Sequence, residues 1–236
     1  HSITYGMHVY QKGSLMAHSL RAYMGASLFF ASINSLMNRA AWGNVNSYQL
    51  RDSLSEYSGI DLTDFFDNWI FQPGFSHFDV ERYEVVETFP ATVKLKIRQK
   101  LREANSLYEG VPIEVLIVGS NFETKREEVI VSGSVTEVDI QVEFEPRFVI
   151  LDDQGLISDA RIIDRQMINQ TGTYDFNDYH QLRMVVNSVE DSAMVALTHH
   201  WVYADPFISN PGIRISDYHY WSFDGVWENL DADLIY

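Results

Sequence analysis

The sequence predicts an α+β protein of several domains, in which helices come first and antiparallel strands follow. Up to about residue 72, apolar residues recur every three or four positions, which is the period of an amphipathic helix. From about residue 78 they recur at every second position, which is the period of a half-buried strand. At 236 residues, the chain is long enough to bury a sizeable core in each part.

The first predicted domain, residues 1–76, is helical. Its periodic segments lie at about 16–24, 28–41, 47–58 and 62–71. Ser47 and Asp61 precede the third and fourth segments and are expected to cap them, because their side chains can accept a hydrogen bond from a free backbone N–H. Gly25, Gly59 and Pro73 stand where helices are expected to end.

The second predicted domain, residues 77–165, is a small antiparallel β-sandwich. Its expected strands lie at 78–80, 92–98, 113–118, 128–131, 135–142 and 148–151. Asp152 to Gly155 has the composition of a turn and is expected to close a hairpin.

The third predicted domain, residues 166–236, is a second β module. Apolar residues run or alternate at 185–186, 193–197 and 201–203, and Asp-Pro and Asn-Pro-Gly turns separate them. The segment from Tyr218 to Trp227 is rich in aromatic side chains, which either stack on sugar rings or pack a core.

Composition excludes several classes of function. The net charge of −16 repels phosphate backbones, so no nucleic-acid partner is expected. The absence of cysteine rules out disulfides and thiolate metal sites. No apolar run is long enough for a membrane span, so no transmembrane segment is expected. The chain begins at His1, which suggests a processed product or a fragment. The absence of cysteine suits a secreted, periplasmic or cell-surface bacterial protein, which is the location expected here.

Metal-binding patterns within single elements are absent from the sequence. A helical zinc pair needs two histidines four residues apart, and none of the eight histidines has such a partner. His199 and His200 would leave opposite faces of a strand and could not hold one ion together. Asp61, Asp64 and Asp67 are best explained as a capped, solvated helix face. We therefore expect no metal ligand and no cofactor in this chain.

Five basic residues alternate along one predicted strand. They are Lys94, Lys96, Arg98, Lys100 and Arg102. Because side chains at every second position share one face of a strand, they form a basic stripe. The stripe either binds an anionic partner or pairs with neighbouring carboxylates on a solvated sheet, which is the commoner arrangement.

Four short motifs together resemble the later part of the catalytic domain of the M1 zinc aminopeptidases, the gluzincin group. These are Y-G-M-H-V-Y-Q-K-G at 5–13, L-R-x-x-x-G at 20–25, S-G-I-D-L at 58–62 and F-F-x-x-W-x-x-x-P-G at 65–74. The resemblance covers about residues 5–78 and implies the helical C-terminal part of a thermolysin-like catalytic domain, followed by β-sandwich domains. The last module more loosely resembles one found in secreted Bacteroidetes members.

The resemblance implies a zinc-dependent aminopeptidase that removes N-terminal residues from peptide substrates. Tyr10 matches the family tyrosine whose hydroxyl stabilises the oxyanion, and Tyr5 matches a second active-site tyrosine of some members. The residues alone do not separate this role of Tyr10 from core packing. The H-E-x-x-H zinc motif of the family is absent here, so the chain is expected to be a fragment that is inactive by itself, with one zinc ion in the intact enzyme.

Two further expectations concern partners. Loss of the upstream half would expose apolar surface, so a homodimer could form through the helical face of residues 1–75. Alternatively, the β modules belong to a degenerate peptidase and form a non-catalytic binding or docking module for a glycan or a partner protein.

Overall fold

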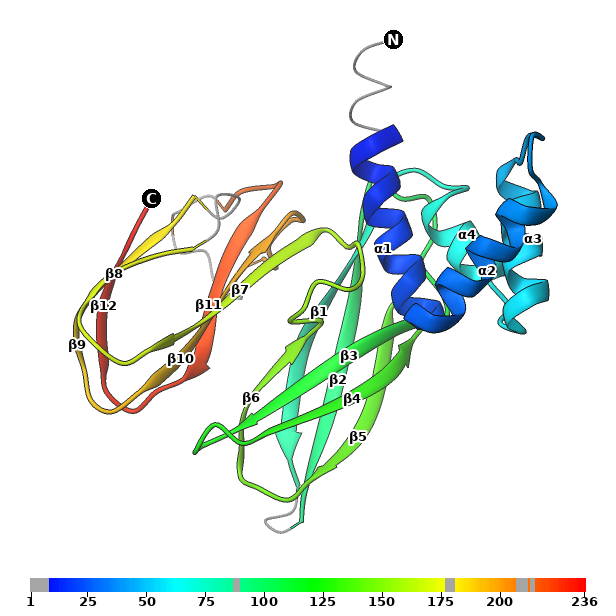
Figure 1. Cartoon of the computed structure of the whole chain (residues 1–236). Coiled ribbons are helices and arrows are strands. Elements are labelled where there is room, and N and C mark those ends of the chain that lie inside the picture. The colour runs from blue at the N-terminus through cyan, green and yellow to red at the C-terminus, as the bar shows by residue number, and fades with distance from the viewer. Residues whose placement is uncertain (1–8, 87–89, 177–180, 207–211, 213–214) are drawn as a thin grey trace.

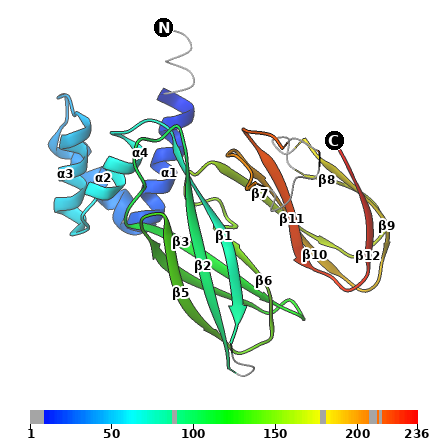
Figure 2. The ribbon, with the colours of Figure 1, turned by 180° about the vertical axis from the view of Figure 1, so that it is seen from behind.

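The computed structural model describes residues 9–86, 90–176, 181–206, 212 and 215–236. The described part contains four helices, α1 (Gly13–Met24), α2 (Ala26–Arg39), α3 (Ser47–Ser58) and α4 (Thr63–Trp69). The helices lie on one side of a first pair of sheets, and a second pair of sheets lies on the other side (Figure 1 and Figure 2). None of the described helices combines the length and apolar character needed to cross a membrane.

The helices begin and end close to where the periodicity placed them, but two caps differ. Asn46, not Ser47, is the N-cap of α3, and its side chain and that of Gln49 form a reciprocal capping box. The α4 helix begins after Leu62, and Asp61 instead accepts a hydrogen bond from the Thr63 N–H at 2.9 Å. Each cap position is shifted by one residue; in both places a neighbouring Asn or Asp side chain accepts a hydrogen bond from a backbone N–H at the start of the helix.

The α4 helix anchors the helical part to the first sheet pair. Phe65, Phe66 and Trp69 are all buried, since residues three and four apart share one helix face. The Trp69 ring stacks on Phe65 at 5.2 Å and meets Tyr108 edge-on at 4.8 Å. Its Nε1–H donates to the Ser158 carbonyl at 2.8 Å. The conspicuous F-F-x-x-W pattern is therefore a core-packing motif.

The described strands form four antiparallel three-stranded sheets. The strands are β1 (Phe75–Val85), β2 (Ala91–Arg102), β3 (Val111–Gly119), β4 (Thr124–Val131), β5 (Val135–Val142), β6 (Pro146–Leu151), β7 (Arg161–Ile168), β8 (Gly172–Asp175), β9 (Arg183–Val189), β10 (Ala193–His200), β11 (Tyr220–Val226) and β12 (Leu230–Ile235). Sheets β1-β2-β5 and β4-β3-β6 make up the first sheet pair, and sheets β11-β10-β7 and β12-β9-β8 make up the second. The predicted change from helices to antiparallel strands is confirmed.

Strand β3 is buried on both faces, which explains its unbroken apolar run. Val115 and Ile117 join the core that the first sheet pair shares with the helices. Leu116 and Val118 point the other way and pack against Met194 and neighbouring residues of the second sheet pair. Because successive side chains alternate across a strand, one strand contributes to two cores.

Strand β10 has the same property and is buried along its whole length. Ala193, Val195 and Leu197 enter the core of the second sheet pair, whereas Met194 and Ala196 face the first sheet pair. All eight residues of β7 pair with β10. The expected domain boundary at 165/166 therefore falls inside β7, whose hydrogen bonds belong to the second sheet pair, and the domain limits stay a prediction.

The turn at Asp152 does not close a hairpin. Gly155 N–H donates to the Asp152 carbonyl at 3.0 Å, so a turn is present. However, β6 pairs with β3 and β7 pairs with β10, so the strands on either side never pair with each other. The hairpin prediction was wrong because turn composition is local, whereas strand pairing is decided by which face must be buried.

The basic stripe lies largely between the sheet pairs rather than on a solvated face. Lys96 pairs with Glu81 at 3.3 Å, as expected for a sheet surface. Lys100, however, is buried, binds the Tyr203 carbonyl at 3.1 Å and pairs with Asp205 at 2.9 Å. Much of the stripe therefore holds the second sheet pair in place.

Candidate functional site

The segment that carries Tyr10 is the entrance to α1. Residues 9–12 form one turn of π-helix that leads into α1, a geometry that often marks functional positions. Tyr10 is 62% exposed, so it is not a core aromatic. Lys12 places its ammonium 5.5 Å from the centre of the Phe75 ring, which ties the start of the helix to β1. Tyr5 lies outside the described residues.

Large apolar side chains are exposed across the helical part. They are Val9, Tyr10, Leu15, Leu28, Phe30, Met37, Trp42, Val45, Tyr48, Tyr57 and Ile70. The α2 helix has only Ser32 buried, although its sequence is strongly apolar. Exposed apolar surface of this extent is typical of a face that packs against another protein part.

A cavity of about 900 Å³ lies beside the start of α1. Gln11, which follows Tyr10, lines it, and the segment 152–163 forms much of the opposite wall. Hydrogen bonds fix this wall: the carboxylate of Asp152 accepts from two backbone N–H groups at 2.8 Å, and Ser158 N–H donates to Ser19 Oγ at 2.9 Å. The cavity is therefore a preformed space next to the predicted catalytic tyrosine.

A second cluster of chemically active side chains lies between the two sheet pairs. His77 on β1 and His200 on β10 are both almost fully buried, and His77 Nε2 lies 2.8 Å from His200 Nδ1. The other nitrogen of His200 lies 2.8 Å from Ser222 Oγ on β11. Together with Asp79, the two histidines offer ligand atoms that all lie within 4.8 Å of one another.

Burial decides the protonation state of this cluster. Burial, together with the weaker effects of the charges of Arg161 and Lys100, lowers the pKa of His200 to about 3. Burial is also the main cause that lowers the pKa of His77. Both imidazoles are therefore neutral at pH 7 and carry an unprotonated nitrogen. Burial raises the pKa of Asp79, against the opposing effect of Arg161.

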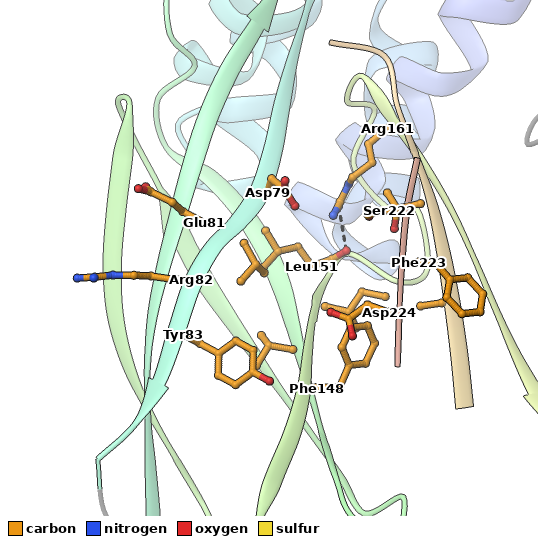
Figure 3. A pocket seen from close by; sticks show the side chains of 15 residues that line it. Asp79, Glu81, Arg82, Tyr83, Phe148, Leu151, Arg161, Ser222, Phe223 and Asp224 are labelled. Carbon is orange, nitrogen blue, oxygen red and sulfur yellow. Dashed lines mark hydrogen bonds between the residues drawn. The ribbon is translucent and has the colours of Figure 1, made fainter. Parts of the chain in front are cut away.

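A cavity of about 400 Å³ opens next to this cluster. Figure 3 shows Asp79, Arg161 and Ser222 at one end of it and Phe148 and Tyr83 at the other. Arg161 is held there by a 2.9 Å hydrogen bond to the Leu151 carbonyl. One end of the cavity is thus polar and borders the buried histidines.

Neighbouring His199 belongs to a different environment. Its Nε2 lies 2.9 Å from His219 Nδ1, and its ring stacks on Trp221 at 4.5 Å. The expectation that His199 and His200 leave opposite faces is confirmed. The aromatic residues here also stack on one another, as Trp201 does on His219 at 5.5 Å, so part of the aromatic segment serves packing.

Patterns within single helices and strands did not predict the His77–Asp79–His200 group. Asp61, Asp64 and Asp67 are absent from any metal-ligand group among the described residues. The one signal for the new group in the sequence is H-x-D at 77–79, where two ligand types share one face of a strand. Its third member lies 123 residues away from His77, beyond any local pattern.

Comparison with known proteins places the helical part. Residues 2–69 match the model of the peptidase family M1 domain. Aminopeptidase N of Lactococcus lactis subsp. lactis is 36% identical over 67 residues, which are 28% of this chain and 8% of that protein. Aminopeptidase 2 of Candida albicans is 31% identical over 72 residues, which are 30% of this chain and 8% of that protein. The chain thus spans a small fraction of the curated relatives it matches.

The likeness of fold extends beyond the helical part. Aminopeptidase A of Legionella pneumophila, solved in complex with aspartic acid, aligns with a TM-score of 0.52 and 20% identity. The alignment covers 60% of this chain and 16% of that one. The helical part of this chain is therefore similar in sequence to the M1 peptidase domain, and the fold of a larger share of the chain is similar to that of a solved aminopeptidase.

Proposed function

We propose that this chain is part of a zinc-dependent aminopeptidase that removes N-terminal residues from peptides, in which Tyr10 stabilises the transition state. The observation that carries the proposal is the match of residues 2–69 to the M1 peptidase domain, with Tyr10 exposed at the entrance to α1 within it.

The chemistry proposed for Tyr10 follows from its hydroxyl group. Attack of water on a peptide carbonyl places negative charge on the carbonyl oxygen, and a fixed hydrogen-bond donor stabilises that charge more than it stabilises the substrate. A phenolic O–H is such a donor. Lys12 on Phe75 and the π-helical turn fix the backbone from which Tyr10 projects. Gln11 and the 900 Å³ cavity next to it offer room for the peptide.

The exposed apolar face of the helices supports the view that another part of the catalytic domain covers it. We place the zinc site in that part, because no pair of histidines in this sequence has the H-E-x-x-H spacing. The isolated chain is therefore expected not to hydrolyse peptides.

The test is steady-state kinetics of the full-length protein with Tyr10→Phe, on an alanyl or leucyl amide. The variant keeps the ring and loses only the hydroxyl, so kcat should fall roughly 10²–10³-fold while KM changes little. Tyr48→Phe is the matched control, because Tyr48 is also exposed in the helical part but stacks on Phe71 at 4.5 Å.

Equal kcat values for the Tyr10→Phe variant and wild type would remove Tyr10 from the catalytic machinery. An inactive full-length protein with zinc supplied would contradict the peptidase proposal itself. Hydrolysis by the isolated chain would contradict the placement of the zinc site outside it.

A further inference from the structure

We propose that His77, Asp79 and His200 form a binding site for a divalent transition metal ion, with zinc as the best match, at the junction of the two sheet pairs. The site is separate from the zinc motif expected of the peptidase family, and it does not depend on the proposed function. Its role is to join β1 of the first sheet pair to β10 of the second.

The strand geometry brings the three ligands together. His77 and Asp79 are two residues apart on β1 and share one face of that strand. His200 has the same parity as Met194 and Ala196 on β10, so it also points toward the first sheet pair. The ligand atoms lie within 4.8 Å of one another, and the closest nitrogens are 2.8 Å apart. Ligands of tetrahedral zinc lie about 3.3 Å apart, so small side-chain movements suffice.

His200 and Asp79 are supported by neighbouring side chains, as ligands of metal sites usually are. Ser222 Oγ lies 2.8 Å from His200 Nε2 and can accept a hydrogen bond from Nε2–H, which leaves Nδ1 unprotonated and able to bind an ion. The Tyr220 ring lies parallel to the His200 ring at 4.3 Å, and its hydroxyl is 3.4 Å from Asp79 Oδ2. Nδ1 of His77 is buried without a hydrogen-bond partner among the described residues.

The chemistry of the ligands selects the ion. Two neutral imidazoles and one carboxylate suit zinc, cobalt or nickel, whereas calcium and magnesium require mostly oxygen ligands. Nearby cations would repel a metal ion, but each has another partner: Arg98 and Lys100 both pair with Asp205, the latter at 2.9 Å, and Arg161 donates to the Leu151 carbonyl at 2.9 Å. The carboxylate of Asp79 supplies the negative charge that the ion needs.

The 400 Å³ cavity gives an ion a route to the site. Asp79 and Ser222 both line it, so water can reach the carboxylate and could occupy a fourth coordination position. An ion held by β1 and β10 would add a metal-mediated link between sheet pairs that also meet through apolar packing, the contacts of the basic stripe and the Tyr220–Asp79 contact.

The test uses the 236-residue chain, stripped of metal with a chelator and then dialysed. Zinc chloride is titrated by calorimetry, and cobalt chloride by visible absorption, in which tetrahedral Co²⁺ gives intense characteristic bands. We expect one ion per chain, a dissociation constant in the low-micromolar range or below, and a higher Tm with zinc present.

Three variants locate the site. Asp79→Asn keeps the shape but removes the charge and should weaken binding at least about 10-fold, since even supporting residues contribute 10–100-fold. His200→Gln should abolish the tetrahedral Co²⁺ spectrum. His219→Gln is the matched control, because the His199–His219 contact at 2.9 Å is also an imidazole pair, but neither residue belongs to a metal-ligand group among the described residues. It should bind zinc as tightly as the wild type.

Absence of saturable binding to the folded wild-type chain would overturn the proposal. So would binding that His219→Gln removes and Asp79→Asn leaves unchanged. Far-ultraviolet circular dichroism checks that each variant is folded; if His200→Gln is not, the comparison of Asp79→Asn with the wild type still decides.

Discussion

Asp159 is a buried carboxyl group whose titration should make stability fall as pH rises. It lies in the segment between β6 and β7, and its side chain is only 6% exposed. Arg161 faces it, with Nε 3.3 Å from Oδ2, the Phe78 N–H donates to it, and Asp152 lies near enough to repel it. Burial outweighs the attraction of Arg161 and raises the pKa of Asp159 from 3.8 to about 7.

The sign of the effect follows from proton counting. Between pH 4 and 7 the folded chain keeps the Asp159 proton, whereas the unfolded chain has released it. The folded state therefore binds more protons, and the free energy of unfolding decreases as pH rises through this window. At about 1.36 kcal/mol for each pKa unit, the gap from 3.8 to about 7 corresponds to a total on the order of 4 kcal/mol.

The perturbation is Asp159→Asn, which mimics the protonated acid at every pH. Arg161 stays charged throughout, so its effect on the variant does not change with pH. Between pH 5 and 8 the wild type should lose roughly 2–3 kcal/mol of stability relative to the variant, the part of the total that falls in this interval. Other groups titrate alike in both proteins and cancel in the difference.

The assay is urea unfolding of both proteins at pH 5, 6, 7 and 8, followed by tryptophan fluorescence. Trp69 reports on this region, because its Nε1–H donates to Ser158, the residue before Asp159. Carbon-detected NMR of the carboxyl groups, assigned with the variant, measures the pKa of Asp159 directly. Stability curves that stay parallel across the pH range, or an Asp159 that titrates near 4, would refute the reasoning.

Two other predictions concern packing. Gly74→Ala should destabilise the chain by more than Gly59→Ala. Both glycines have φ near +75°, a backbone conformation that costs about 1–2 kcal/mol for alanine. Only at Gly74 would the added Cβ also meet backbone atoms, those of residues 102–104, at 2.3–2.4 Å. Equal losses in urea unfolding would contradict this. Leu116→Ala removes a fully buried side chain from the apolar contact between the sheet pairs. It should lower the free energy of unfolding by about 2–5 kcal/mol and make proteolysis of the second sheet pair faster. An unchanged midpoint of urea unfolding would show that this contact does not contribute to stability.

Much of the fold follows from periodicity because its strands are long and regular. The alternation from residue 92 to 98 gave β2, and the apolar run from 113 to 118 gave β3. The same patterns could not say which strands pair. Asp152 to Gly155 has the residues of a hairpin turn, yet it lies in the segment that connects the two sheet pairs. The carboxylate of Asp152 accepts hydrogen bonds from two backbone N–H groups of this segment. The carboxylate of Asp153 pairs with Arg126 and Arg165.

The basic stripe shows the same limit. Its alternation correctly predicted one shared face, but the sequence could not show that the second sheet pair covers part of that face. Lys100 and Arg102 bind the backbone carbonyls of Tyr203 and Trp201, a hundred residues later in the chain. Every residue carries a backbone carbonyl, so the sequence does not show which carbonyls take part in an interface.

The histidines show which metal sites a local sequence pattern can exclude and which it cannot. The alternation of side chains along a strand predicted that His199 and His200 point to opposite faces. This is confirmed, because His199 contacts His219, whereas His200 contacts His77. The same geometry argued against a metal site within one helix or strand, but it could not test a site shared by two strands of different sheets. That site is possible because β10 is buried on both faces, so that one face places a histidine against the neighbouring sheet pair. A strand with no solvated face is therefore the place to search for ligands from distant segments, and H-x-D on the opposing strand is the pattern to pair with it.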